Sequence, residues 1–378
     1  MGRRRHRERR GADHGIRFRG RQDDLVARGG GVNAEALASL LPVAPRPAPE
    51  ERLSSWLSRV AEIYGMSANA LLAHFRLAGF SALKLEQGLS PGQGALIATR
   101  AGLSARTIDN MTFAALAPHA RVMIAPSARY FCPSCAQTPA IGRKDAALPW
   151  TFWCSVHGVR LWARDKRPMK SFLPESVLER LDRLARRGAA RLAAWAEDCD
   201  AVGEIDPPTV PELLRFLTTP YRRPSPPSLA EQPRLSLEAR RANHAFLTRP
   251  IVRQALLVVA PEYDRFAPVL AKPVRPGLAA LACGSLLQNY ALAVGVARLT
   301  ENPVERAAAA LAAADAEGET NLRRVLGAWP SATRRRIDVE LRRLTDAQPA
   351  GKAPRRRRLQ RSSINYARVP QISARLVP

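Results

Sequence analysis

Two short pairs of metal-binding residue types constrain this chain more than any other feature of its sequence. Cys132 and Cys135 have two residues between them, and eighteen residues later Cys154 and His157 repeat that spacing. Two intervening residues allow a tight turn to point both donors at one ion, and the spacer brings the two pairs together. This spacing is typical of zinc ribbons and treble clefs, so it predicts one zinc ion bound by all four side chains.

The expected site has no position left for a substrate or a catalytic water. Four protein ligands complete a tetrahedral zinc, and such closed sites are structural. Nearby aromatic residues are predicted to pack around it, namely Tyr130, Phe131, Trp150, Phe152 and Trp153. The sequence also has no Walker-type phosphate loop, nucleophile elbow or kinase signature. We therefore expect no catalytic residues and a protein that is not an enzyme; an unrecognised carboxylate site is the competing interpretation.

Positive charge is concentrated at the two ends of the chain. The 378 residues carry a net charge of +26, to which residues 1–30 contribute +6 and residues 352–378 contribute +8. A surface of this sign attracts polyanions, with DNA or RNA the usual partner. An Arg-rich composition arising from GC-rich coding is the alternative explanation. Both ends are predicted to be disordered basic arms.

Between these arms, apolar residues spaced for helices alternate with glycine and proline breaks. Ala and Leu dominate the apolar residues, which favours helices over sheets. The predicted fold is mainly α, with a helical, helix-turn-helix-like N-terminal domain, a small zinc-ribbon or treble-clef segment and a helical C-terminal domain. The predicted boundaries are a basic arm at 1–40, helices at 41–127, the zinc segment at 128–170, helices at 171–205, a Pro-rich linker at 206–235 with a short helix near Pro211–Leu217, C-terminal helices at 236–346 and a basic tail at 347–378.

An uncharged run from Pro276 to Ala297 is long enough to cross a bilayer. Gly284, Gln288 and Asn289 near its centre favour a buried core helix instead. Five cysteines do not suggest a disulfide framework in a chain of this length, and no export signal is readable. We expect a cytoplasmic protein without membrane contact.

Two triplets in the N-terminal part have the spacing of a helix-turn-helix: a small residue, a turn glycine four positions later and an apolar anchor six positions beyond that. They are Ala61, Gly65 and Leu71, and then Ala98, Gly102 and Ile108. Helical hairpins that only pack also use glycine turns, and the first pair carries little charge on its second helix. The second pair is the candidate for DNA contact, with Arg100 and Arg106 near phosphates and with Thr107, Asp109 and Asn110 near base edges.

Three stretches of the sequence resemble the TniQ family of transposition proteins, which is related to the TnsD target selectors. They are LSSWLSRVAEIYGMSANALLAHF, then RYFCPSCAQ with WTFWCSVHGVRLW, and finally VLGAWPSATRRRIDVELRRL. The resemblance covers residues 40–165 and, more weakly, residues 236–346. Matched to the knuckles of that family, the zinc ligands are Cys132, Cys135, Cys154 and His157.

The resemblance implies an accessory protein rather than the recombinase. TniQ-like proteins work beside a DDE transposase and an AAA+ ATPase, and they select or license the target by binding DNA or by docking on an RNA-guided effector. Many relatives carry a second Cys pair, but WARDKRPMKSF follows the His-Gly step here without a cysteine, so one zinc is expected. The sequence leaves a homodimer open. The alternative function is a zinc-containing helix-turn-helix transcription regulator that needs no transposition partners.

Overall fold

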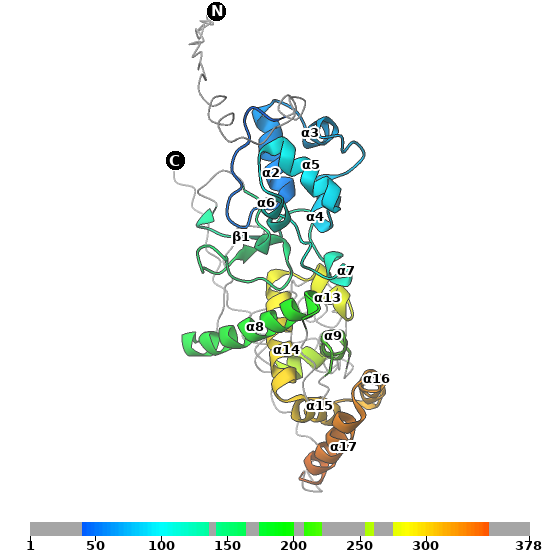
Figure 1. Ribbon diagram of the computed structural model, residues 1–378. Coiled ribbons are helices and arrows are strands. Elements are labelled where there is room, and N and C mark those ends of the chain that lie inside the picture. Colours follow the sequence, from blue (N-terminus) through cyan, green and yellow to red (C-terminus); the bar gives the residue numbers. More distant parts are fainter. Residues whose placement is uncertain are drawn as a thin grey trace, which may run out of the picture.

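The computed structural model describes residues 40–135, 141–163, 174–199, 208–220, 254–260 and 275–347. These residues are mainly helical, which confirms the predicted fold class, and they include one two-stranded sheet near the middle of the molecule (Figure 1). The predicted arm at 1–40, apart from Leu40, and the predicted tail beyond Ala347 lie outside the described residues.

Short helices separated by tight turns form the N-terminal part. Serines begin four of them, because the hydroxyls of Ser67, Ser81, Ser90 and Ser104 accept hydrogen bonds from backbone N–H groups of the first turn. The elements are α2 (Leu53–Ile63), α3 (Ala68–His74), α4 (Ala82–Gln87), α5 (Pro91–Ala101), α6 (Ala105–Asn110) and α7 (Pro118–Arg121). We refer to α2 through α6 as the N-terminal helix cluster.

The N-terminal helix cluster has a hydrophobic core of its own. Its largest members, Trp56, Phe75 and Leu85, are almost completely buried. A buried ion pair joins α4 to the start of α2, with the Arg52 guanidinium 2.7 Å from the Glu86 carboxylate. Because both side chains are removed from water, each depends on the other for charge compensation.

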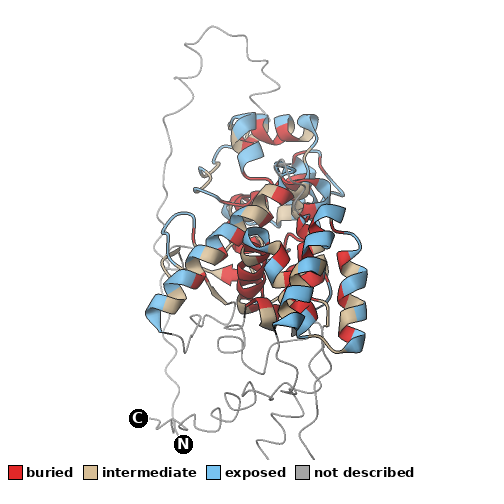
Figure 2. Cartoon of the chain, turned by 90° about the horizontal axis from the view of Figure 1, so that it is seen from below, coloured by how far each residue is buried: buried red, intermediate tan, exposed pale blue. Residues whose placement is uncertain are grey.

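The described helices that follow α7 form a second and larger core, to which α7 contributes Ala120. They are α8 (Glu175–Ala196), α9 (Val210–Leu217), α11 (Gln254–Val259), α13 (Leu278–Cys283), α14 (Leu286–Glu301), α15 (Pro303–Ala312), α16 (Ala316–Leu326) and α17 (Ser331–Asp346). The helix α14 lies at the centre and is buried on nearly all sides, whereas the outer helices turn one face to solvent (Figure 2). The helix α8 crosses α14 closely at Gly188, where a Cβ atom would lie 1.8 Å from the Ala293 carbonyl oxygen.

The uncharged run from Pro276 to Ala297 forms two helices, not the single core helix that the sequence suggested. The run breaks at Gly284, and Ser285 caps α14 by accepting a hydrogen bond from the Gln288 backbone N–H. Both α13 and α14 contribute buried residues to the larger core. Among the described residues, no helix is both long enough and apolar enough to cross a membrane.

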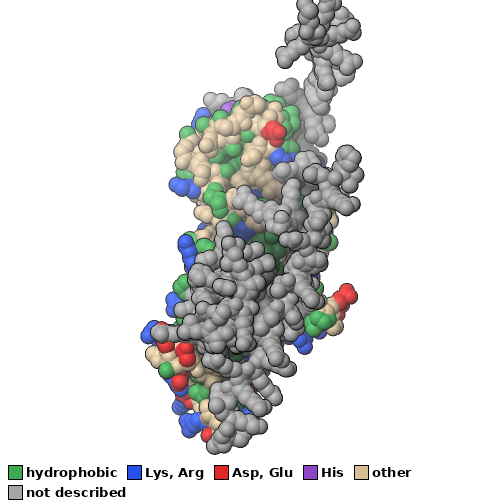
Figure 3. All heavy atoms as spheres, turned by 180° about the vertical axis from the view of Figure 1, so that it is seen from behind, with side chains coloured by type: hydrophobic (Ala, Val, Ile, Leu, Met, Phe, Trp, Pro, Cys, Tyr) green, Lys and Arg blue, Asp and Glu red, His purple; other side chains and the backbone are tan. Residues whose placement is uncertain are grey.

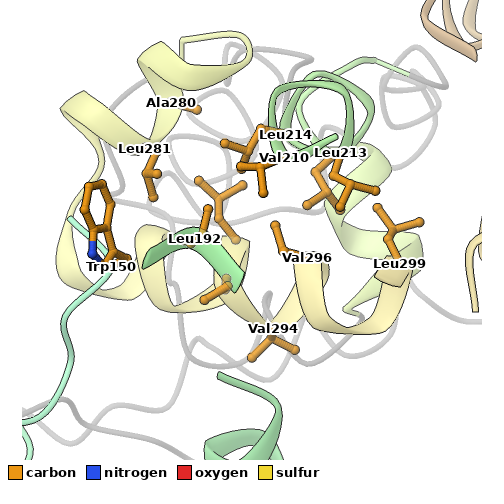
Figure 4. Close-up of a cluster of buried hydrophobic side chains, with 14 of the residues drawn as sticks. Trp150, Leu192, Val210, Leu213, Leu214, Ala280, Leu281, Val294, Val296 and Leu299 are labelled. Carbon is orange, nitrogen blue, oxygen red and sulfur yellow. The ribbon is translucent and has the colours of Figure 1, made fainter. Parts of the chain in front are cut away.

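The segment predicted as a Pro-rich linker contributes a helix to this core in its described part. The helix α9 (Val210–Leu217) corresponds to the short helix predicted near Pro211–Leu217. Its apolar side chains, including Leu213 and Leu214, face residues of α14 such as Val296 (Figure 4). Packing of this kind makes α9 a structural part of the fold and not a spacer.

The described residues of the range 128–163, which we call the knuckle segment, also pack on the larger core. β1 (Tyr130–Phe131) pairs antiparallel with β2 (Trp162–Ala163), and a short 3-10 helix, η2 (Asp145–Ala147), lies between them in sequence. Trp150 belongs to one continuous hydrophobic cluster with the C-terminal helices, and its ring lies beside Leu281 (Figure 4). The middle of the chain therefore shares its core with the C-terminal helices.

Candidate metal centre

The first cysteine pair follows directly after β1. Cys132 is buried and Cys135 is half-buried. The backbone N–H of Cys135 donates a hydrogen bond to the Sγ atom of Cys132 at 3.4 Å. This bond closes a tight turn, which is how a spacing of two residues brings both sulfur atoms to one place.

The second pair lies at the tip of a short hairpin. The backbone N–H of Cys154 donates to the Val159 carbonyl oxygen at 2.8 Å, and the N–H of Gly158 donates to the Cys154 carbonyl oxygen at 2.9 Å. Gly158 has a φ of 65°, a left-handed conformation that favours glycine. The left-handed backbone at position 158 explains why a glycine follows His157 in the sequence. His157 itself is exposed at the tip of the hairpin.

A buried carboxylate supports the second pair from η2. Asp145 accepts hydrogen bonds from the backbone N–H of Ser155 at 3.0 Å and from its hydroxyl at 2.9 Å. Because Ser155 directly follows Cys154, these bonds hold the chain in place next to a ligand. The role of Asp145 could not be predicted from the sequence, since a single Asp within a spacer has no diagnostic spacing.

The four predicted ligands converge on one point. Their donor atoms all lie within 4.8 Å of one another. The Nδ1 atom of His157 is 3.7 Å from the Sγ atom of Cys132, 3.3 Å from that of Cys135 and 3.6 Å from that of Cys154. The sulfur atoms of Cys135 and Cys154 are 3.6 Å apart. This arrangement can hold one metal ion.

Crowding of the thiols changes how readily they ionise. Burial, together with hydrogen bonds to Cys132 and Cys154, raises the pKa of Cys135 to about 12. Burial also acts to raise the pKa of Cys132, but hydrogen bonds from the Cys135 backbone and the neighbouring thiols hold it below its ordinary value. Thiolates this close repel one another, so a cation bound between them is what would allow all three to ionise.

Comparison with known families adds an independent observation. Residues 42–161 match the family model TniQ, and this span contains the N-terminal helix cluster and all four ligands. The match shows that residues 42–161, about a third of the chain, form a TniQ domain. It confirms the resemblance seen in the sequence and associates the protein with transposition. None of the curated proteins and none of the solved structures matches the chain.

Within the TniQ domain, the spacer between the two ligand pairs is attached to the N-terminal helix cluster. The backbone N–H of Gly142 donates to the Ser55 hydroxyl at 2.8 Å, and its carbonyl oxygen accepts from the Arg52 N–H at 2.9 Å. The N–H of Lys144 donates to the Glu50 carbonyl oxygen at 2.9 Å. These bonds fix the position of the metal centre relative to the helix cluster.

On its other side, the TniQ domain is attached to the C-terminal helices. The buried Tyr130 hydroxyl accepts a hydrogen bond from the Asn289 side chain at 2.9 Å, across 159 positions of sequence. Arg160 forms an ion pair with Asp182, which also accepts a hydrogen bond from the Tyr290 hydroxyl at 2.6 Å. Burial and this hydrogen bond raise the pKa of Tyr290 above its ordinary value. Sequence spacing gave no indication of these contacts.

Both helix pairs of the expected spacing are present in the TniQ domain. Gly65 joins α2 to α3 with a φ of 63°, and Gly102 joins α5 to α6 with a φ of 64°. The small and apolar positions of both triplets are buried: Ala61, Leu71, Ala98 and Ile108. This arrangement occurs both in helix pairs that contact DNA and in helix pairs that serve only to pack within a protein core.

The residues predicted to contact DNA lie on the α5–α6 pair in different environments. Arg106 and Asn110 are exposed on α6. Arg100 is half-buried and donates to a backbone carbonyl oxygen at the end of α3 at 3.4 Å. The Thr107 hydroxyl lies 2.8 Å from the hydroxyl of the N-cap residue Ser104. Asp109 is exposed as well, so Arg106, Asp109 and Asn110 are the most accessible of the five predicted residues.

Proposed function

We propose that this protein is a non-enzymatic adaptor of DNA transposition that binds DNA and links a target to the transposition machinery. The observation that carries the proposal is the TniQ match over residues 42–161 together with the cluster of four metal ligands inside it. The partners expected from the family resemblance are a transposase and an AAA+ ATPase of the same element, and an RNA-guided effector where one is present. Homodimerisation is compatible with this role.

Zinc fits the geometry of the four donors. With bonds of about 2.3 Å to sulfur and about 2.0 Å to nitrogen, a zinc tetrahedron has edges of roughly 3.8 Å between sulfurs and roughly 3.6 Å between sulfur and nitrogen. The separations of 3.3 to 3.7 Å among these donors are close to those edges. Four protein ligands leave no open coordination position, so the proposed role of the ion is structural.

The α5–α6 pair is the proposed DNA-reading element. On α6, the exposed Arg106 is suited to a phosphate or a guanine edge, and the exposed Asn110 is suited to an adenine edge. Thr107 supports this surface indirectly, because its hydroxyl is occupied by the Ser104 cap. Arg100 is placed to contact a phosphate beside the turn while its side chain rests against α3.

The test of DNA reading uses the α2–α3 pair as a matched control. The double substitution Arg106→Ala, Asn110→Ala should reduce discrimination between target and random duplexes by about 1–3 kcal/mol in fluorescence anisotropy titrations. The equivalent change on the first pair, Asn69→Ala with Arg76→Ala, removes exposed side chains of the same types. Equal effects of the two double variants would contradict the assignment to α6.

The test of the adaptor role is a cross-linked pull-down of the tagged full-length protein from its native cells, followed by mass spectrometry. Transposase and AAA+ ATPase subunits should be enriched over a control purification from untagged cells. Recovery of neither partner, with tight binding to one operator carrying two half-sites, would instead establish a transcription regulator.

A further inference from the structure

The last described helix, α17, has one face in the larger core and one face in solvent. Thr333 and Ile337 are buried, and Leu341 and Leu344 pack against the same core. On the opposite side, Val339 is 62% exposed. Helical spacing places three exposed arginines around that valine: Arg335, Arg336 and Arg342.

Two acidic residues of α17, Asp338 and Glu340, are paired with other arginines. The Arg323 side chain on α16 lies 3.2 Å from Asp338, and the Arg343 side chain lies 2.6 Å from Glu340. Among the described residues, Arg335, Arg336 and Arg342 have no ion pair and no hydrogen-bond partner. Their charge is therefore available to a ligand.

The spacing of these three arginines suits an extended anion. Arg335 and Arg342 are seven residues apart, which is two helical turns or about 10 Å along the axis. Arg336 adds a third guanidinium on the adjacent stripe of the helix surface. A single small anion cannot bridge two turns, whereas a duplex presents phosphates every 3.4 Å or so along each strand. Arginine also bonds phosphate in a bidentate manner.

The position of α17 separates it from the proposed reading element. In Figure 1, α17 lies at one end of an elongated molecule and α6 lies in the half near the other end, with the knuckle segment and α8 between them. Viewed from behind, the end that carries α16 and α17 shows basic and acidic side chains side by side (Figure 3). At this end of the molecule, binding of an anion therefore depends on the arginines without an acidic partner more than on the net charge of the surface.

We infer that the outer face of α17, carrying Arg335, Arg336 and Arg342, is a second DNA contact that binds the phosphate backbone without reading sequence. This inference rests on the proposed DNA-binding function and adds a second site to it. One exposed valine among three arginines is too small an apolar surface for a stable protein interface, which favours DNA over an acidic protein partner.

The experiment is a salt titration of DNA binding by the full-length protein, using a random-sequence duplex. The triple variant Arg335→Gln, Arg336→Gln, Arg342→Gln should bind more weakly and lower the slope of log K against log salt by roughly 2 to 3. Its matched control, Arg183→Gln, Arg215→Gln, Arg275→Gln, removes three exposed arginines from other elements and should leave the slope nearly unchanged.

A second variant separates charge from fold. Replacing the same three arginines with lysine keeps the positive charge, so it should retain most of the salt slope, and all variants should melt like the wild type. If the glutamine variant and its control behave alike while the wild type binds DNA, α17 is not a DNA contact although the proposed function stands. If the wild type does not bind DNA at all, the proposed function fails and the inference fails with it.

Discussion

The N-terminal helix cluster and the knuckle segment belong to one family match but are stabilised differently. The cluster closes a core of its own around Trp56 and Phe75. The knuckle segment instead buries Trp150 and Phe152 in the larger core, together with residues as distant as Ile337. The TniQ match ends at residue 161, just before β2 pairs with β1. The TniQ domain recognised in the sequence is therefore not a single packing unit, because its two regions belong to different hydrophobic cores.

Removal of a metal ligand should give the largest effect and should affect only one of the two regions. Structural zinc contributes about 10–16 kcal/mol in zinc-finger peptides, which is as much as the whole stability of a domain. We expect Cys154→Ala to lose one zinc per chain and to lose amide-exchange protection in residues 128–163, α8 and α14. Protection in α2 through α6 should persist.

The control for this experiment is Cys199→Ala, because Cys199 is exposed and lies outside the ligand cluster. It should keep the metal and the wild-type exchange pattern. Simultaneous loss of protection in the helix cluster would show that the two regions unfold as one and are not stabilised separately.

The second prediction concerns the N-terminal helix cluster alone. Glu86→Ala leaves the buried Arg52 charge without its partner and removes the acceptor of the Ser54 backbone N–H. The expected loss is about 3–5 kcal/mol in the free energy of unfolding, measured by urea denaturation. Glu62→Ala, at an exposed position of α2, should change it by less than about 0.5 kcal/mol. A large loss from the exposed variant would contradict this explanation.

The third prediction concerns the larger core. Gly188→Ala places a methyl group 1.8 Å from the Ala293 carbonyl oxygen, so α8 must move away from α14. We expect a loss of about 1–3 kcal/mol and a lower melting temperature. Exchange should increase in the knuckle segment, which packs on these helices. Ala190→Ser, at an exposed position of α8, is the control, and a stable Gly188→Ala protein would show that the two helices can separate freely.

The smallest effect is expected at the turn of the α5–α6 pair. Gly102 is left-handed with open space around it, so Gly102→Ala should cost roughly 1 kcal/mol through backbone strain alone. Gly92→Ala, also in open space but without a positive φ, should be neutral or slightly stabilising in the same thermal melt. An equal loss at both positions would mean that the turn conformation is not the cause.

The features that could be predicted from the sequence are those whose residues lie close together along the chain. The four ligands are two pairs of neighbours, and the turn glycines lie between two short helices, so each signal is contained in a few residues. The break at Gly284 had a local signal as well, because Ser285 followed by Gln288 is a capping box. That motif marks the point at which the uncharged run divides into α13 and α14.

The contacts that attach the metal centre to the C-terminal helices could not be predicted from short sequence motifs. Tyr130 meets Asn289 from 159 positions away, and the Arg160–Asp182 pair connects two segments that are separate in sequence. Tyrosine, asparagine and charged residues are common on helix surfaces, so nothing marks these as partners before the chain is folded. The shared core of the knuckle segment and the C-terminal helices could not be predicted for the same reason.

The division of cores sets an order for folding during synthesis. The helix cluster needs only residues up to Met111, so we expect it to fold while most of the chain is still untranslated. The larger core cannot close until the ribosome has released Ile337. The cysteines and the histidine emerge between these two events, so a metal ion can bind them before the surface on which the knuckle segment packs has formed.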